Sequence, residues 1–321
     1  MKTRPSAQQG AALLTAMIIV TLVAALAAAM TWRQTRAVQV EAAERARVQS
    51  AWMLQGALDW ARLILREDAF ANQSNGGKHN WDHLGEPWAV PLAEARLSTF
   101  LAAQDSAAQG DASDGPEAFL SGRIDDAQAR YNLRNLMNDS ATDHTEQLTL
   151  ERLCASARMP AGTADQILRE VRAALANPPG DNAPLPPFNV AQLSWFGLPP
   201  DVIAKLEPLV TLLPVTTQLN LNTASSAVIA AVLDVDPNAA DILVRSRASA
   251  PLASPQAAQL FLPVNTNLGN RVSVNSSYFY VTGRLRLDEH VLQQRSLLQR
   301  NGTTVLVLSR ERVSESAPTE P

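Results

Sequence analysis

The sequence of 321 residues is poor in the side chains on which most enzymes and small secreted domains depend. It contains one cysteine, Cys154, and four histidines. A single thiol cannot form an intrachain disulfide, and it excludes a zinc site built on several thiolates. A nucleophile elbow, a phosphate-binding loop and a dinucleotide-binding glycine fingerprint are also missing from the sequence. These absences favour a structural or interaction protein over an enzyme.

The chain also lacks an excess of positive charge. Its 27 basic residues face 31 acidic residues, which gives a formal net charge of −4. This balance argues against a protein that binds nucleic acid through bulk positive charge. Hydrophobic residues make up 46% of the chain, which excludes a disordered protein and predicts a packed core.

One long apolar run is present, and it lies at the amino terminus. Residues 11–32 contain no charged side chain, and about 20 apolar residues suffice for a helix to cross a bilayer. Lys2 and Arg4 precede the run, and Arg33 follows it. A simple secretory signal peptide is less favoured, because its apolar core normally has only about 7–15 residues. The run predicts a single membrane-spanning helix.

The junction before this run has a distinctive sequence, Gln8-Gln9-Gly10-Ala11. A short basic leader that ends in glycine and leads directly into an apolar helix resembles the amino terminus of type IV pilins and type II secretion pseudopilins. The resemblance implies that a prepilin peptidase cleaves between Gly10 and Ala11 and that Ala11 is then N-methylated. It also implies a bacterial inner-membrane protein with its amino terminus in the cytoplasm and its globular part in the periplasm.

The fifth residue after the expected cleavage site departs from the common pilin pattern. Most pilins carry glutamate there, whereas this chain has Thr15. Within the pseudopilins, the lack of this glutamate resembles the sequences of the K-type minor pseudopilins. The resemblance implies a position at the filament tip.

The rest of the chain predicts an α+β fold in which a long helix packs on an antiparallel sheet. Residues 33–66 contain no proline and one glycine, and continue the helix. A hairpin is expected over Ala118–Ile124 and Ala129–Leu136, and strands return at residues 277–287, 291–299 and 303–313. Between them, several helical segments, many of which begin with a capping residue, predict an all-helical insert, again similar to the K-type subunits. The predicted organisation is a leader at 1–10, a membrane helix at 11–32, a pseudopilin domain at 33–137 and 269–313, an insert at 138–268 and a flexible tail at 314–321.

The expected second strand of the hairpin carries a run of short polar side chains that is similar to a run in the family. Asp126, Arg130, Asn132 and Asn135 are spaced as in D-x-x-x-R-x-N-L-x-N-L. Short amides and carboxylates at a strand end usually bind backbone groups, so we expect a structural role for them.

A second motif inside the expected insert, Leu219–Ser225, resembles the opening of a helix-hairpin-helix DNA-binding motif. The hairpin that follows, 233–238, has no glycine and contains a proline and two aspartates. These residues disfavour binding of a phosphate. A membrane-anchored DNA receptor of the competence type therefore remains only an alternative, and no nucleic acid partner is expected. Thr223 or Ser225 is expected to cap the next helix.

No cofactor is certain, but calcium is possible. Calcium prefers oxygen-rich loops, and it is known among pseudopilins. Asp125, Asp126, Asp139 and Asp143 are the candidate ligands, although none of these acidic runs matches an EF-hand loop. Cys154 is expected to be a small core residue.

Together these features predict a K-type minor pseudopilin that acts through assembly. The resemblance implies a position at the tip of the type II secretion pseudopilus, where the subunit initiates assembly for the export of folded proteins across the outer membrane. Two other minor pseudopilins, types I and J, are the partners that it implies.

Overall fold

The computed structural model describes residues 9–74, 81–97, 118–138, 144–176, 178, 180, 182–287 and 290–313. The chain divides into two compact units, residues 1–55 and residues 56–321. Each unit is described by itself below.

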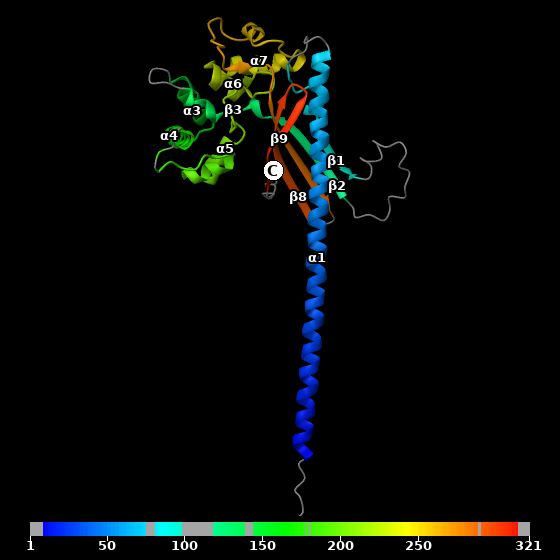
Figure 1. Ribbon diagram of the computed structural model, residues 1–321. Coiled ribbons are helices and arrows are strands. Elements are labelled where there is room, and N and C mark those ends of the chain that lie inside the picture. The colour runs from blue at the N-terminus through cyan, green and yellow to red at the C-terminus, as the bar shows by residue number, and fades with distance from the viewer. Residues whose placement is uncertain are drawn as a thin grey trace, which may run out of the picture. The chain divides into compact units, whose positions relative to one another are not determined.

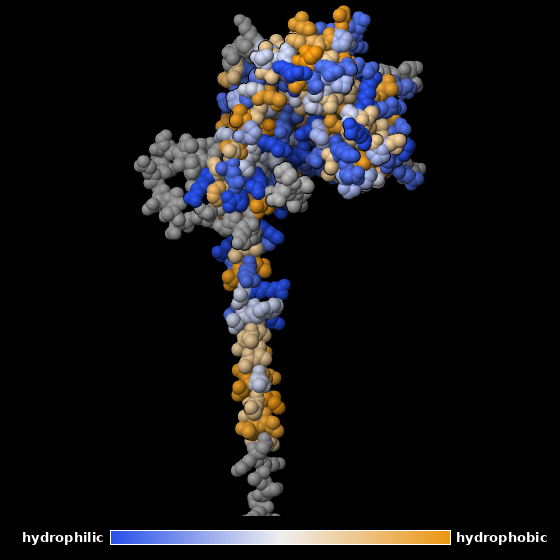
Figure 2. Space-filling model, turned by 180° about the vertical axis from the view of Figure 1, so that it is seen from behind, coloured by the Kyte–Doolittle hydropathy of each residue, from blue (hydrophilic) through white to orange (hydrophobic). Residues whose placement is uncertain are grey.

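Helix α1 (Gln9–Ser74) begins in the first unit and ends in the second. It extends eight residues past the predicted end at residue 66, because no proline interrupts the sequence. Within the part of the chain that the structure describes, α1 is the helix that is long and apolar enough to cross a membrane. Apolar side chains surround its lower part (Figure 2), as expected of a helix that faces lipid.

The second unit is built around a five-stranded antiparallel sheet with the order β1-β2-β7-β8-β9. The strands are β1 (Leu92–Arg96), β2 (Ala118–Asp126), β7 (Tyr278–Leu287), β8 (His290–Asn301) and β9 (Thr304–Val313). The last three strands confirm the strands predicted at residues 277–287, 291–299 and 303–313. Gly302 has a φ of +55° in the turn that joins β8 to β9, a conformation that glycine adopts without steric cost.

One face of this sheet packs against the end of α1 (Figure 1). Leu58, Ala61 and Leu65 recur at helical spacing and contact apolar side chains of the strands. Trp88, in the short 3-10 helix η1 (Pro87–Ala89), completes this core and meets the Phe279 ring edge to face at 5.2 Å. The fold class predicted from the sequence is confirmed here.

The predicted hairpin over residues 118–136 is wrong in its second half. After β2 the chain forms the 3-10 helix η2 (Ala127–Ala129), then the two-residue strand β3 (Tyr131–Asn132) and the 3-10 helix η3 (Leu133–Met137). Strand β3 pairs in parallel with β4 (Val210–Thr211), and β2 pairs with β1 and β7. The local alternation of side chains could not reveal a partner 79 residues away.

The inserted segment is helical apart from β4 and β5 (Leu219–Asn220), which pairs with β6 (Val272–Ser273). Its helices are α3 (Thr145–Ser156), α4 (Thr163–Leu175), η4 (Val190–Phe196), α5 (Pro200–Leu206), α6 (Ser226–Leu233), α7 (Pro237–Ser249) and η5 (Pro255–Leu260). They share a core of their own that includes the buried Cys154. Burial raises the pKa of this thiol to about 11, so it is an inert core residue.

The insert meets the face of the sheet that lies opposite α1. Tyr278, Tyr280 and Leu297 of the sheet form a small apolar cluster with Ala127 and with Leu213 of the insert. The Thr211 and Tyr280 hydroxyl groups lie 3.0 Å apart in this contact. The sheet is therefore covered on both faces, by one helix on one side and by the insert on the other.

Candidate functional site

A buried group of polar side chains joins the insert to the sheet, and we call it the polar junction: Asp82, Asp126, Asn220, Thr223 and Ser276. At its centre, the Asp126 carboxylate ends strand β2. Its Oδ2 accepts hydrogen bonds from Ser276 Oγ at 2.6 Å, Thr223 Oγ1 at 2.6 Å and Asn220 Nδ2 at 3.0 Å. Its Oδ1 accepts from the Gln128 N–H at 2.7 Å. Burial raises the pKa of Asp126 to about 6, although the two hydroxyl donors act to lower it.

Asn220 reaches several chain segments at once from a fully buried position. Besides Asp126, its Nδ2 lies 3.2 Å from the Asp82 carbonyl oxygen and 3.0 Å from Ser276 Oγ. Its Oδ1 accepts from the Asn222 N–H at 2.9 Å. One amide of the insert therefore binds the end of β2, the loop before η1 and the segment before β7.

Arg300 of β8 extends the polar junction to α1. Its guanidinium forms ion pairs with Asp68 of α1, at 2.6 Å, and with Asp82. It also donates to the Ser276 carbonyl oxygen at 2.9 Å and stacks on the Phe279 ring at 4.7 Å. Asp82 Oδ2 accepts from the Ser276 N–H, so each charged group has a partner, which buried charges require.

Glu86 adds a further carboxylate beside the two aspartates that bind this arginine. One oxygen atom of each carboxylate of Glu86, Asp68 and Asp82 lies within 4.8 Å of the other two. Glu86 Oε2 accepts from the Trp88 indole at 2.6 Å and from the His83 N–H at 3.1 Å. Burial, followed by repulsion from Asp68, raises the pKa of Glu86 to about 7.

A second set of contacts joins the segment after β2 to the insert, as expected for the polar run. The Asn132 side chain accepts from the Leu213 N–H at 3.2 Å and donates to the Val215 carbonyl oxygen at 2.7 Å. Asn135 exchanges hydrogen bonds with both backbone groups of Thr217, at 2.8 and 3.0 Å. These side-chain hydrogen bonds hold the backbone of residues 213–217, as the backbone of a neighbouring strand would do in a sheet.

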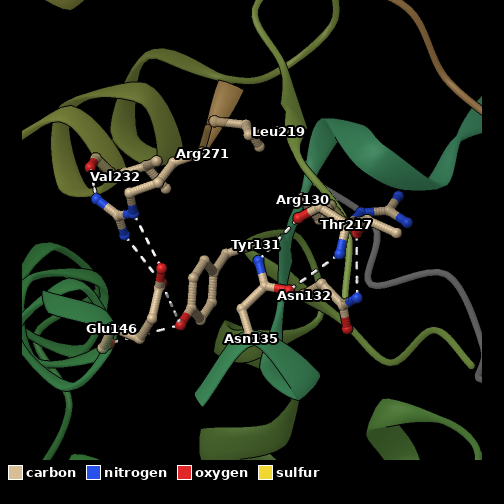
Figure 3. A pocket seen from close by; sticks show the side chains of 9 residues that line it. All are labelled: Arg130, Tyr131, Asn132, Asn135, Glu146, Thr217, Leu219, Val232 and Arg271. Atoms are coloured by element: carbon tan, nitrogen blue, oxygen red, sulfur yellow. Dashed lines mark hydrogen bonds and ion pairs between the residues drawn. The ribbon is translucent and has the colours of Figure 1, made fainter. Parts of the chain in front are cut away.

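A small hollow beside these asparagines is lined mainly by polar groups that bind one another (Figure 3). The Glu146 carboxylate accepts a hydrogen bond from the Tyr131 hydroxyl at 2.9 Å. It also accepts hydrogen bonds from Nε and Nη2 of Arg271, each at 2.9 Å. Arg271 also donates to the Val232 carbonyl oxygen. The polar groups that line the hollow therefore connect α3, α6 and β3 to one another, and they stabilise the fold.

The helix-hairpin-helix-like motif is turned toward the polar junction. Two polar residues of the motif, Asn220 and Thr223, donate hydrogen bonds to Asp126. Ser225 Oγ caps α6 by accepting from the Val228 N–H, as predicted. In the following hairpin, Asp236 accepts from the Asn238 N–H at 2.8 Å, which occupies an amide that a phosphate would need. These contacts favour a structural role for the motif.

The residues predicted from the amino-terminal pattern lie in the first turns of α1. Gly10 and Ala11 are helical, and the Thr15 hydroxyl donates to the Ala11 carbonyl oxygen at 2.9 Å. The threonine therefore satisfies its hydroxyl within its own helix. The cleavage and methylation at this site stay predictions.

The four predicted calcium ligands fall into two groups. Asp125 and Asp126 are neighbours at the end of β2, but Asp125 pairs with Arg123 at 2.9 Å and Asp126 is held in the polar junction. Asp139 and Asp143 lie outside the described residues. The calcium site stays a prediction.

Comparison with known proteins gives three relatives that match nearly the whole chain. No protein-family model matches the sequence. Type II secretion system protein K of Pseudomonas aeruginosa is 28% identical and covers 91% of this chain and 89% of its own length. The proteins of the same name from Pectobacterium carotovorum and Klebsiella pneumoniae are 28% and 27% identical over 95% and 94% of this chain.

The fold leads to the same class. A long apolar helix that packs on an antiparallel sheet, with a helical insert, defines a pilin-like protein. A chain of the crystal structure of the GspK–GspI–GspJ complex of the enterotoxigenic Escherichia coli type II secretion system matches with a TM-score of 0.64 and 19% identity. The match covers 85% of this chain and 99% of that chain. Together with the relatives, it confirms the resemblance to the K-type minor pseudopilins of type II secretion.

Replacing the central amide of the polar junction tests its contribution to stability. Asn220→Ala leaves the Asp126 and Ser276 groups short of a partner in a buried site. We expect it to lower the free energy of unfolding of fragment 33–321 by about 1–3 kcal/mol. The exposed Asn238→Ala is the control and should change it by less than about 0.5 kcal/mol. Equal stability of the two variants in urea denaturation would contradict the role of Asn220.

Glu86 predicts an unusual dependence of stability on pH. Its pKa in the folded chain, about 7, lies above the ordinary 4.5, so the folded chain binds the proton more tightly than the unfolded chain. The free energy of unfolding should therefore fall as the pH rises from about 4.5 to about 7. Glu86→Gln should flatten this fall while it keeps an acceptor for the Trp88 indole. Thermal melts at pH 5, 6, 7 and 8 measure the slope, and an unchanged slope in the variant would refute the assignment.

Proposed function

We propose that the chain is the tip subunit of a type II secretion pseudopilus, where it initiates assembly with other minor pseudopilins. The observation that carries the proposal is the fixed attachment of the insert to the sheet through the polar junction. An insert on a flexible linker could swing aside in a filament, but one held by buried hydrogen bonds cannot. Its bulk leaves no room for a subunit stacked above it, which favours the last position in the filament.

The amino-terminal helix supports the same position. A pilin glutamate at residue 15 would supply a carboxylate for the amino terminus of a neighbouring subunit. Thr15 is neutral, and its hydroxyl is already bonded to Ala11. The chain therefore lacks this means of docking beneath another subunit, and the partners that fit are minor pseudopilins of types I and J below it along the spine helix.

The proposal includes the route to the membrane. The prepilin peptidase cleaves between Gly10 and Ala11, and Ala11 is N-methylated. Residues 11–32 then hold the subunit in the inner membrane, with its globular part in the periplasm, until the helix enters the filament core. Export of folded proteins across the outer membrane follows from the growth of that filament.

Processing of the leader can be tested with one substitution. Gly10→Leu places a bulky side chain at the cleaved bond, so the prepilin peptidase should leave the chain at full length. Mass spectrometry of the membrane fraction distinguishes the intact chain from a chain that begins at methylated Ala11. Normal cleavage of the variant would refute the leader assignment, and Thr3→Leu, elsewhere in the leader, serves as the control.

Assembly is tested with soluble domains. Fragment 33–321 should form a stable complex with the periplasmic domains of the type I and type J minor pseudopilins in size-exclusion chromatography. The major pseudopilin domain should not replace either partner. A fragment that remains monomeric with both partners present would contradict the proposal.

Calcium binding belongs to the proposal as a separate test. If Asp125, Asp126, Asp139 and Asp143 bind the ion, millimolar calcium should raise the melting temperature of fragment 33–321, because a ligand of the folded state stabilises it. Asp139→Asn/Asp143→Asn should abolish the shift. An unchanged melting temperature in wild-type fragment would refute the site.

A further inference from the structure

Arg130 is the member of the polar run whose side chain the fold leaves without a polar partner. Asp126, Asn132 and Asn135 each bind residues of the insert. Within the part of the chain that the structure describes, the Arg130 guanidinium makes no hydrogen bond and no ion pair. Figure 3 shows it turned away from the Glu146 carboxylate. Arg130 is nevertheless half-buried, so its charge is partly removed from water with no polar group to replace its hydration.

A second arginine contacts the same aromatic ring as Arg130. The Cζ atom of Arg295, in β8, lies 4.1 Å from the centroid of the Tyr280 ring, and the Cζ atom of Arg130 lies 5.8 Å from it. The ring itself is fixed, because it is buried and its hydroxyl lies 3.0 Å from that of Thr211. Burial, followed by repulsion from Arg295, lowers the pKa of Arg130. Two like charges are therefore held close together where the insert meets the sheet.

The carboxylates around these arginines are too few to neutralise them. Glu207, which follows α5, pairs with Arg295 at 3.1 Å, and Asp125 of β2 pairs with Arg123 at 2.9 Å. Both carboxylates also attract Arg130, but each is already bound to another arginine. Among the described groups of this cluster, three guanidinium groups face two carboxylates. One positive charge is left over, and it is that of Arg130.

The excess charge and the shape of the guanidinium group define the ligand. A monovalent anion neutralises one positive charge, whereas a phosphate ester carries about −1.5 to −2 at pH 7 and would leave an excess of negative charge. A planar guanidinium donates two parallel N–H bonds to a carboxylate, and stacking on an aromatic ring leaves its edge free to do so. The Arg295 side chain is 22% exposed and Arg130 is half-buried, so an anion can reach both from solvent.

We propose that Arg130 and Arg295 bind one carboxylate group on the face of the sheet opposite α1. The inference goes beyond the proposed function, because it involves neither the membrane helix nor the contacts with the type I and type J subunits. A small organic acid and an acidic side chain of a docked protein offer the same carboxylate chemistry, and their sources are distinguished by measurement.

The test uses acetate as the probe and the full-length chain in detergent as the sample. Relative to chloride at equal ionic strength, about 100 mM acetate should raise the melting temperature of the wild type by about 2 °C, because a ligand of the folded state stabilises it. Arg130→Gln should abolish this shift. Arg130→Lys should keep part of it, since lysine binds a carboxylate as a point charge. Arg169→Gln, at a 68% exposed side chain of α4, is the control and should respond as the wild type does.

A merely structural role of Arg130 gives a different result. In chloride, Arg130→Gln should change the melting temperature by less than about 1 °C, because the lost side chain has no polar partner in the fold. An equal loss of melting temperature in both salts would show that Arg130 supports the fold, and would overturn the proposal. An acetate shift that survives in Arg130→Gln, or a larger shift with inorganic phosphate than with acetate, would overturn it as well.

Native mass spectrometry distinguishes the two sources of the carboxylate. The chain is purified from cells in buffers without organic acids. A small acid that stays bound to the wild type and is missing from Arg130→Gln identifies a free acid as the ligand. A chain that carries no acid but responds to acetate indicates a carboxylate of a docked protein.

Discussion

The buried carboxylate of Asp126 is the constraint on which the arrangement of this protein depends. A charge removed from water is costly unless hydrogen bonds replace its hydration. Asp126 accepts those hydrogen bonds from Gln128, which follows β2, from two residues of the insert and from Ser276, which precedes β7. The three segments must therefore meet at one point for the chain to fold at low free energy. A network of this kind specifies one geometry, because a partly satisfied network is worse than an apolar contact.

The same constraint explains why a sheet and an insert with separate cores act as one unit. The apolar contact between them, around Leu213 and Tyr280, is small. Hydrogen bonds fix the geometry that a small apolar contact leaves open: Asn220 donates to the Asp82 carbonyl oxygen, and Asn132 and Asn135 bind residues 213–217. Arg300 carries the connection through the sheet to Asp68 of α1. Fixed geometry is what a subunit needs if its insert is to block stacking.

Local patterns in the sequence predicted the elements whose stabilising contacts are close along the chain. The apolar run and the absence of proline predicted α1, and the strand patterns at residues 291–299 and 303–313 predicted β8 and β9. The structural role of Asp126, Asn132 and Asn135 was also predicted, but their partners were not. Their distant partners lie 81 to 150 residues away along the chain, and no periodicity records such a distance. Strand β3 was misassigned for the same reason, because Tyr131 pairs with Val210. The buried ion pairs of Arg300 could not be predicted, because a single arginine in an alternating strand pattern is typical of a solvent-exposed position.

Native-state hydrogen exchange tests most directly whether the polar junction makes one unit of the sheet and the insert. In wild-type fragment 33–321, amides of β7 and of α6 should open with the same free energy, because the two elements unfold together. In Asp126→Ala, α6 should open at a lower free energy than β7, since the insert has lost its fixed attachment. Equal protection of both elements in the variant, or unequal protection in the wild type, would contradict the account.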